Sequence, residues 1–439
     1  QSADDESVRW QVGASWFEYE YQIEVHSQFA GIVLGLEDEA NGGQPFEPGT
    51  RNFDMATNIG IYGGVTWDVN DRTTLSFEGR YQDDDITNIN ARTGDTFDNV
   101  TESFQPRLAI NHALNDDWSL YGQASSGTNP AGVNTIFASP NTIASLAAAR
   151  AAGVITYDET TFRAFDEEKL TNLELGIKGG TLDNRLQLAA AIYAMEWEGR
   201  LQQTGFDWAG VDPDPVTGLC AGIPGCWNDG SFDPDGTIFN AQQTMSGNIP
   251  IPSGDADLYG VELEASYYLN DNWSFRGAFA ISSAEYAPHC DEAPVNDLGF
   301  TPTSTVAEGA VFDCVDVTGN NLTYEPDTTL SFLATYRAPL GGGDWEWAGR
   351  FNIRYANEQY IDPLNLTSLP ATTQVNGSIT FTDGNWDISI FGNNLTDEDT
   401  PRFAAYNGDR NINPNQSQDN YWLQLRIPRE IGARLSYRF

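Results

Sequence analysis

The chain has 439 residues, 12% of them aromatic, and 22 basic against 63 acidic residues give it a formal net charge of -41. Because phosphate binding needs a basic face, this balance argues against a nucleic-acid partner. The high aromatic content argues against a disordered acidic chain and suits the aromatic girdles of a membrane barrel. No apolar run reaches the roughly 18 residues that a membrane-spanning helix needs. Acidic stretches such as 82–85 and 212–215 are interpreted as solvated loops.

Apolar and polar residues alternate along fourteen segments, which we predict to be antiparallel β-strands. In the first half of the chain, Ile59, Ile61, Val65 and Trp67 fall on one face of such a segment. A period of two gives a strand one apolar and one polar face. In chain order the predicted strands lie near 8–20, 57–69, 72–86, 103–114, 118–127, 169–180, 185–203, 257–269, 273–286, 324–338, 344–360, 370–382, 386–395 and 430–439.

Short turns and long polar connections alternate between these strands. Residues 114–118 read Leu-Asn-Asp-Asp-Trp and residues 269–273 read Leu-Asn-Asp-Asn-Trp, a nearly identical turn. Asn, Asp and Gly tolerate positive φ and therefore close tight hairpins. One long connection holds an alanine-rich stretch, 143–150, that we predict to be a short helix. The long connections are predicted near 87–102, 128–168, 204–253, 286–323 and 396–420.

Short turns at one rim and long loops at the other are typical of an outer-membrane barrel. The last segment has an apolar face that ends on Phe439, as the closing strand of such a barrel would. An unpaired strand edge inside lipid would cost several kcal/mol for each backbone group, so the barrel must close. We therefore predict an all-β fold, a transmembrane antiparallel β-barrel with about fourteen strands in this chain. A soluble propeller or sandwich is the alternative.

Six segments, in chain order, resemble motifs of the TonB-dependent receptors. Residues 168–178 resemble the family pattern E-x-x-x-N-x-E-x-G-x-K, and residues 391–397 resemble its late N-L-x-D motif. The segment 121–134 departs from the family at Thr128 and Asn129, where an aromatic and a basic residue are usual. The remaining matches are F-x-P-R-L at 104–108, x-G-V-E-x-E at 259–264 and the terminal segment 435–439.

This resemblance implies a receptor in the outer membrane of a Gram-negative bacterium that imports a scarce nutrient, most often a ferric siderophore or a similar chelate. The implied partners are outer-membrane lipid, lipopolysaccharide and the TonB complex, which acts through an amino-terminal plug. The family barrel has 22 strands, and no plug is recognisable in this sequence. We therefore expect residues 1–439 to be part of the barrel alone, its last fourteen strands. The first residues lack the features of a signal peptide, as in a mature or truncated product.

Four cysteines allow three pairings. The local pairs are the simplest, because each closes a loop within one polar segment, and we expect disulfides in an oxidising compartment. Zinc is disfavoured because CxxC spacing and neighbouring histidines are lacking. The expected pairs are Cys220 with Cys226 and Cys290 with Cys314.

Several cations fall on the polar faces of the predicted strands. They either pair with carboxylates of the lumen such as Glu78, Glu174, Glu262 and Glu264, or they form a basic track for an anionic substrate such as a ferric chelate. Lys178 belongs to the same group. Aromatic residues of the long loops either contact a ligand or pack the loops. The candidate ligand-binding residues are Arg80, Arg276, Arg350, Arg354, Trp208 and Trp227.

No catalytic constellation stands out, so we do not expect an enzyme. No cofactor is expected either, apart from a possible loop-bound calcium ion at 233–236. That Asp-Pro-Asp-Gly stretch lacks further acidic ligands at the proper spacing, and an ordinary acidic turn is the alternative. Two other functions compete with the receptor: a passive porin-like or fatty-acid channel of about fourteen strands, and a secreted acidic protein that binds carbohydrate.

Overall fold

The computed structural model describes residues 6–24, 51–90, 96–134, 163–211, 239–291, 303–307, 310–408 and 419–439, together with Ala147 and Arg150. Fourteen strands lie side by side in one antiparallel sheet, in the order in which the chain visits them. They are β1 (Val8–Glu24), β2 (Arg51–Asn70), β3 (Thr73–Asn90), β4 (Thr96–Ala113), β5 (Trp118–Asn129), β8 (Glu168–Thr181), β9 (Leu186–Val211), β10 (Phe239–Tyr268), β11 (Trp273–Asp291), β14 (Thr328–Pro339), β15 (Glu346–Ala356), β18 (Thr372–Thr382), β19 (Trp386–Asn393) and β22 (Glu430–Tyr437).

Eight shorter strands lie in the connections. β13 joins β11 and β12, and the other six form two-stranded hairpins. Their bounds are β6 (Gly132–Val133), β7 (Ala164–Phe165), β12 (Thr303–Ala307), β13 (Ala310–Asp316), β16 (Gln359–Tyr360), β17 (Ser368–Leu369), β20 (Phe403–Gly408) and β21 (Asp419–Gln424).

Each of the fourteen predicted segments coincides with one strand of the large sheet, so the prediction of fold and strand number is confirmed. Several expectations about the connections were wrong. β3 and β4 enter the connection predicted at 87–102, β9 and β10 enter the one predicted at 204–253, and β11 enters the one predicted at 286–323. The acidic stretch 82–85 also lies within β3 rather than in a loop. Where both faces of a hairpin meet water, the backbone still pairs but the apolar alternation that marks a strand is lost. The helix predicted at 143–150 falls almost entirely outside the described residues.

Side chains of Asn and Asp close the short turns. The Oδ1 atom of Asn115 accepts hydrogen bonds from the backbone N–H groups of Asp117 and Trp118, both at 2.9 Å. Asn270 and Asp383 make the same pair of bonds in two later turns. These side chains fix the turn geometry locally, which explains why the Asn- and Asp-rich turns could be placed from the sequence.

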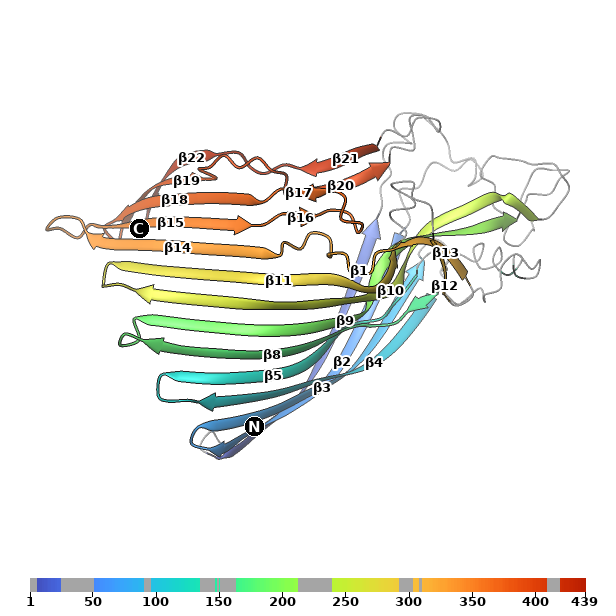
Figure 1. The fold of residues 1–439 in the computed structure, drawn as a ribbon, viewed down its shortest axis with the longest axis horizontal. Helices are drawn as coiled ribbons and strands as arrows, with labels where there is room; N and C mark the ends of the chain where they lie inside the picture. The colour runs from blue at the N-terminus through green and yellow to red at the C-terminus, as the bar shows by residue number, and fades with distance from the viewer. Residues whose placement is uncertain are drawn as a thin grey trace.

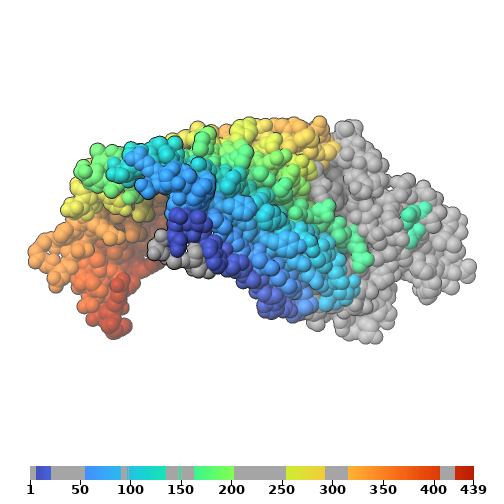
Figure 2. All heavy atoms as spheres, turned by 90° about the horizontal axis from the view of Figure 1, so that it is seen from below, coloured from blue at the N-terminus to red at the C-terminus, as the bar shows by residue number. Residues whose placement is uncertain are grey.

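The sheet forms an arc of a barrel wall. All the short turns lie at one end of the strands and the longer connections at the other, as Figure 1 shows. Figure 2 shows that the wall is arched and hollow on one side. Within the described residues β1 pairs only with β2 and β22 only with β19, so each end of the arc presents an unpaired edge.

The two faces of the wall differ in character. Large apolar side chains on one face are exposed, for example Leu173 (57%), Leu175 (56%) and Ile192 (55%). A wall one sheet thick has no second layer to cover such a face, and lipid hydrocarbon covers it in an outer-membrane barrel. The opposite face carries polar and charged side chains and lines the lumen. No helix within the described residues is long and apolar enough to cross a membrane.

Candidate functional site

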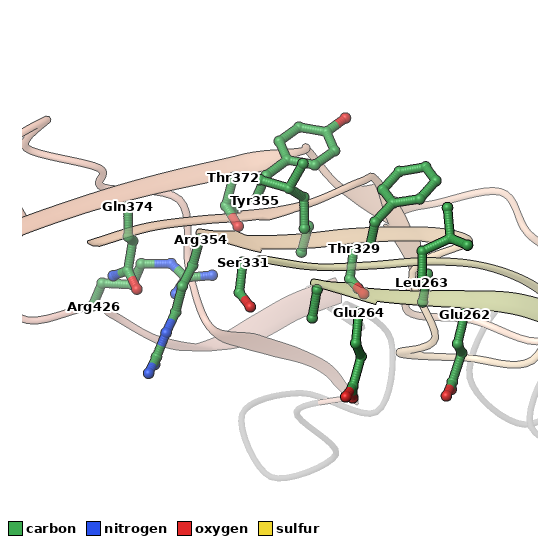
Figure 3. A pocket seen from close by; sticks show the side chains of 15 residues that line it. Glu262, Leu263, Glu264, Thr329, Ser331, Arg354, Tyr355, Thr372, Gln374 and Arg426 are labelled. Atoms are coloured by element: carbon green, nitrogen blue, oxygen red, sulfur yellow. The ribbon is translucent and has the colours of Figure 1, made fainter. Parts of the chain in front are cut away.

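The strand register places five residues from neighbouring strands in one row on the lumen face, and four of them are polar. Glu264 of β10 lies opposite Ala278 of β11, which lies opposite Ser331 of β14. Ser331 lies opposite Arg354 of β15, which lies opposite Gln374 of β18. Figure 3 shows Glu264, Ser331 and Arg354 projecting from the same side of the strands. The row is therefore set by backbone pairing alone.

An open depression of about 480 Å³ follows this row. Carboxylates stand on one side of it, at Glu262 and Glu264, and guanidinium groups stand on the other, at Arg354 and Arg426. The Nε atom of Arg426 donates to the backbone oxygen of Thr400 at 2.9 Å, which anchors that side chain from the last long connection. Acidic and basic groups thus face the same hollow without touching.

Arg350 lines a second depression of the same face, closer to the end of the chain. Its polar neighbours there are Ser378, directly opposite it on β18, together with Asn352, Asn376 and Arg434. The hollow holds two guanidinium groups and no carboxylate among its lining residues. This part of the lumen wall is locally basic although the chain as a whole is strongly acidic.

On β3 to β8 the lumen cations are engaged. Arg107 forms an ion pair with Glu78 at 3.2 Å and donates to Gln123. Glu174 in turn accepts hydrogen bonds from Tyr121 at 2.7 Å and from Gln123 at 2.9 Å. The side chains form a continuous network across four strands, so the charges here are satisfied within the wall.

Arg80, a predicted ligand-binding residue, belongs to a closed network of this kind. Its guanidinium donates to Gln82 at 2.8 Å and to Asn58 at 2.9 Å. Both amides donate to the carboxylate of Asp84 at 2.6 Å, and Asp84 and Gln82 are buried. Lys178 lies 5.6 Å from the centre of the Tyr121 ring. Neither cation pairs directly with the glutamates that we expected as partners, because amides and a phenol ring stand between them.

Arg276, Arg350 and Arg354 behave differently. They lie on the lumen face of β11 and β15, as predicted, but within the described part of the chain no hydrogen bond or ion pair holds their side chains. The residues opposite Arg354 are Ser331 and Gln374, and those opposite Arg350 are Thr335 and Ser378. The expected pairing with Glu262 or Glu264 is therefore absent, because neutral side chains occupy the neighbouring positions.

The other predicted site residues are placed only in part. The backbone of Trp208 lies in β9 opposite Met245, whereas Trp227 and the calcium candidate 233–236 lie outside the described residues. No group of three metal-binding side chains occurs within the described residues.

Two of the four cysteines, Cys290 and Cys314, lie in strands that the structure describes. Cys290 is disulfide-bonded. Its strand β11 pairs with β13, which carries Cys314, two residues before the position opposite Cys290. The pairing of Cys290 with Cys314 stays a prediction, and Cys220 and Cys226 lie outside the described residues.

Sequence reasoning missed the contribution of the last connection. Arg426 and the highly exposed Trp422 (69%) come from the segment that contains β21, where no strand was expected. The only sequence signal was the aromatic pair Tyr421 and Trp422, a few residues before Arg426.

Three connections are tied together at the long-loop end of β11 to β22. The Oη atom of Tyr324 donates to the backbone oxygen of Ala404 at 2.7 Å, and the Tyr324 and Phe403 rings stack at 5.1 Å. Asn320 donates to the backbone oxygen of Pro363 at 2.9 Å. The two Tyr324 contacts join the connection after β11 to the one after β19, and the Asn320 bond joins it to the one after β15. Neighbouring groups partly desolvate the Glu325 carboxyl and raise its pKa, although much of the residue's surface stays exposed.

An arched antiparallel sheet with one apolar and one polar face, short turns at one end and long connections at the other is the wall of a transmembrane β-barrel. The family model described as "TonB dependent receptor-like, beta-barrel" matches residues 3–395. The chain belongs to this family of outer-membrane receptors, and the resemblance found in the sequence motifs is confirmed.

Solved structures share this fold at low sequence identity. The ferric yersiniabactin uptake receptor FyuA from Yersinia pestis superimposes with a TM-score of 0.63 at 16% identity, over 100% of this chain and 52% of that one. The siderophore receptor PiuA from Acinetobacter baumannii gives 0.58 at 13% identity, over 99% and 54%. The ferric citrate transporter FecA gives 0.57 at 13% identity, over 99% and 52%.

The chain thus spans about half the length of these three structures. No curated protein matches the chain by sequence.

Proposed function

We propose that this chain is part of the barrel of a TonB-dependent receptor that imports an anionic ferric chelate, such as a ferric siderophore, across the outer membrane of a Gram-negative bacterium. Family membership supports the receptor class, and members of the class are transporters rather than enzymes. The three structures named above are described as receptors or transporters of ferric chelates or siderophores, which supports the substrate class.

The inference of an anionic substrate rests on three lumen arginines that no described residue neutralises. They are Arg276, Arg350 and Arg354. An unpaired charge in a narrow lumen is costly. A protein with only 22 basic residues among 439 keeps three of them at neighbouring positions of one wall. We infer that their partner is a transiently bound anion, and that Arg426, which lines the same hollow as Arg354, assists them.

We further propose that the remaining strands and the plug that contacts TonB lie outside residues 1–439. The two unpaired edges of the arc, at β1 and β22, need partners within the bilayer because no water reaches their backbone groups there. Outer-membrane lipid and lipopolysaccharide are the expected surroundings of the apolar face.

The test is the double substitution Arg350→Ala with Arg354→Ala. Uptake of radioactive iron, supplied as a ferric siderophore at limiting concentration, should fall about tenfold or more, because a charge-assisted hydrogen bond contributes roughly 1.5–3 kcal/mol. Arg107→Ala is the matched control, since Arg107 lies on the same face but is paired with Glu78. Heat-modifiable migration on gels checks that each barrel is folded.

Unchanged uptake in the folded double variant would rule out the basic track. A separate outcome concerns the class of function: stable conductance of the purified protein in liposomes, without TonB or a ligand, would favour the passive channel.

A further inference from the structure

The apolar face of the wall is grooved over β11 to β22. The groove has a volume of about 730 Å³, and large apolar side chains form its sides. Several of these side chains are well exposed, among them Phe351 (43%), Ile379 (45%) and Ile390 (55%). The groove lies on the face that meets hydrocarbon, opposite the depressions of the lumen.

Glycines make the floor. Gly349 lies between Tyr336 and Ile379 in one row of the register. In the next row Gly377 lies between Phe351 and Gly392. On adjacent strands a large side chain therefore lies next to a glycine, which has no side chain, and the surface is lower at the glycine.

At two of these glycines a Cβ atom would fit without a clash, so neighbouring atoms do not require glycine there. A Cβ atom added at Gly349 would lie 3.5 Å from the Trp347 ring, and one at Gly377 would lie 3.5 Å from the backbone oxygen of Arg350, both ordinary contacts. Gly392 is different, because its Cβ would come within 2.5 Å of Leu395. Leu395, just beyond β19, folds back over Gly392 and lines the groove there. Gly349 and Gly377 leave space that the fold itself does not need.

Aromatic rings line the end of the groove nearest the short turns. The Trp273 and Tyr336 rings lie 4.7 Å apart, and the Tyr336 and Trp347 rings lie 4.8 Å apart. Trp273 is the first residue of β11 after its short turn. Trp and Tyr collect at the level of lipid headgroups, and short turns of outer-membrane barrels face the periplasm. The groove thus begins at the periplasmic interface and enters the hydrocarbon of the inner leaflet.

We propose that this groove binds one acyl chain of a phospholipid from the inner leaflet. It is continuous with the lipid-facing surface, and the outward side chains of β15 and β18 beside it are apolar or small. Adjacent strands lie about 4.8 Å apart, so a floor of glycines on neighbouring strands suits a single hydrocarbon chain. An α-helix of another protein, about 10–12 Å across, is too wide to enter it.

The first test is lipid retention. The protein is purified in mild detergent with phosphatidylethanolamine and phosphatidylglycerol and examined by native mass spectrometry. The wild type should keep one phospholipid under conditions that strip the rest, and the variant Gly349→Leu with Gly377→Leu should lose it. Gly122→Leu is the matched control, because Gly122 lies on the outward face of β5 with its nearest contacts at 3.4–3.7 Å and outside the groove.

Equal retention by all three proteins, or no retention by the wild type, would overturn the proposal. A polypeptide held in place of the lipid would do the same and would point to a protein partner.

If the leucine variant does not fold, a second measurement tests whether the groove binds an acyl chain. Phospholipids with brominated acyl chains quench tryptophan fluorescence on contact. Trp273→Phe with Trp347→Phe should remove at least twice as much of the quenching as Trp118→Phe with Trp386→Phe, two outward tryptophans that do not line the groove. Equal losses from the two pairs would contradict the proposal.

Discussion

Two parts of the lumen wall use the same residue type in opposite ways. On β2 to β8, Arg80 and Arg107 are held by amides and a carboxylate of the wall. On β15, Arg350 and Arg354 have small or neutral side chains opposite them and no partner among the described residues. Since all four arginines lie on polar strand faces, the face alone does not define their role. The side chains within hydrogen-bonding reach of each arginine decide its role: Glu78 lies directly opposite Arg107, and Gln82 and Asn58 reach Arg80 from its own strand and from a diagonal position.

The largest expected effect on uptake comes from giving Arg354 a carboxylate partner of the kind that Arg107 already has. Ser331→Asp places a carboxylate directly opposite Arg354. The new ion pair should neutralise Arg354 and lower uptake of a ferric chelate about tenfold, a difference of about 1.4 kcal/mol. The measurement is the affinity for the chelate, determined by fluorescence quenching, together with iron uptake. Ser331→Asn is the isosteric control, and equal affinity in both variants would show that the charge of Arg354 is irrelevant to binding.

Breaking the paired wall should affect stability rather than transport. Arg107→Ala removes the ion pair with Glu78, in which both side chains are more than a third exposed (46% and 43%). Solvent screens such a pair, so we expect the free energy of unfolding to fall by less than about 1 kcal/mol, measured by urea titration of the barrel in lipid. Iron uptake should stay within a factor of two. A large loss of uptake at unchanged stability would show that Arg107 also takes part in transport, which would contradict the difference between the two regions.

The smallest effect concerns Glu325, an acid in the connection between β11 and β14. Partial desolvation raises the pKa of Glu325. The folded state then holds this proton more tightly than the unfolded state, so stability falls as the pH rises from the ordinary glutamate pKa through the raised value.

Glu325→Gln removes that dependence, and the variant should be more stable than the wild type at pH 7 and equally stable at pH 4. Thermal melting at the two pH values measures the difference. A wild type that gains stability over this interval relative to the variant would mean that a cation does hold Glu325 ionised.

The sequence was sufficient to place the strands and to assign the faces. Alternation located all fourteen strands of the wall and put Arg276, Arg350 and Arg354 on the lumen side, because a period of two decides the face. It did not reveal which residue stands opposite each arginine, since that depends on the register between segments joined by loops of any length. Arg426 was missed for a related reason. It lies in no regular strand, and only the path of the last connection brings it beside Arg354.

The hydrogen bonds of Tyr324, Asn320 and Asn321 have a consequence for how the receptor can move. They join the connections that follow β11, β15 and β19 into one body, since Asn321 also accepts and donates bonds with Asn365. One of these connections cannot swing over the mouth alone without breaking contacts to the other two. The described parts of these three connections therefore form one rigid section of the rim, and any movement of this section has to carry all three together.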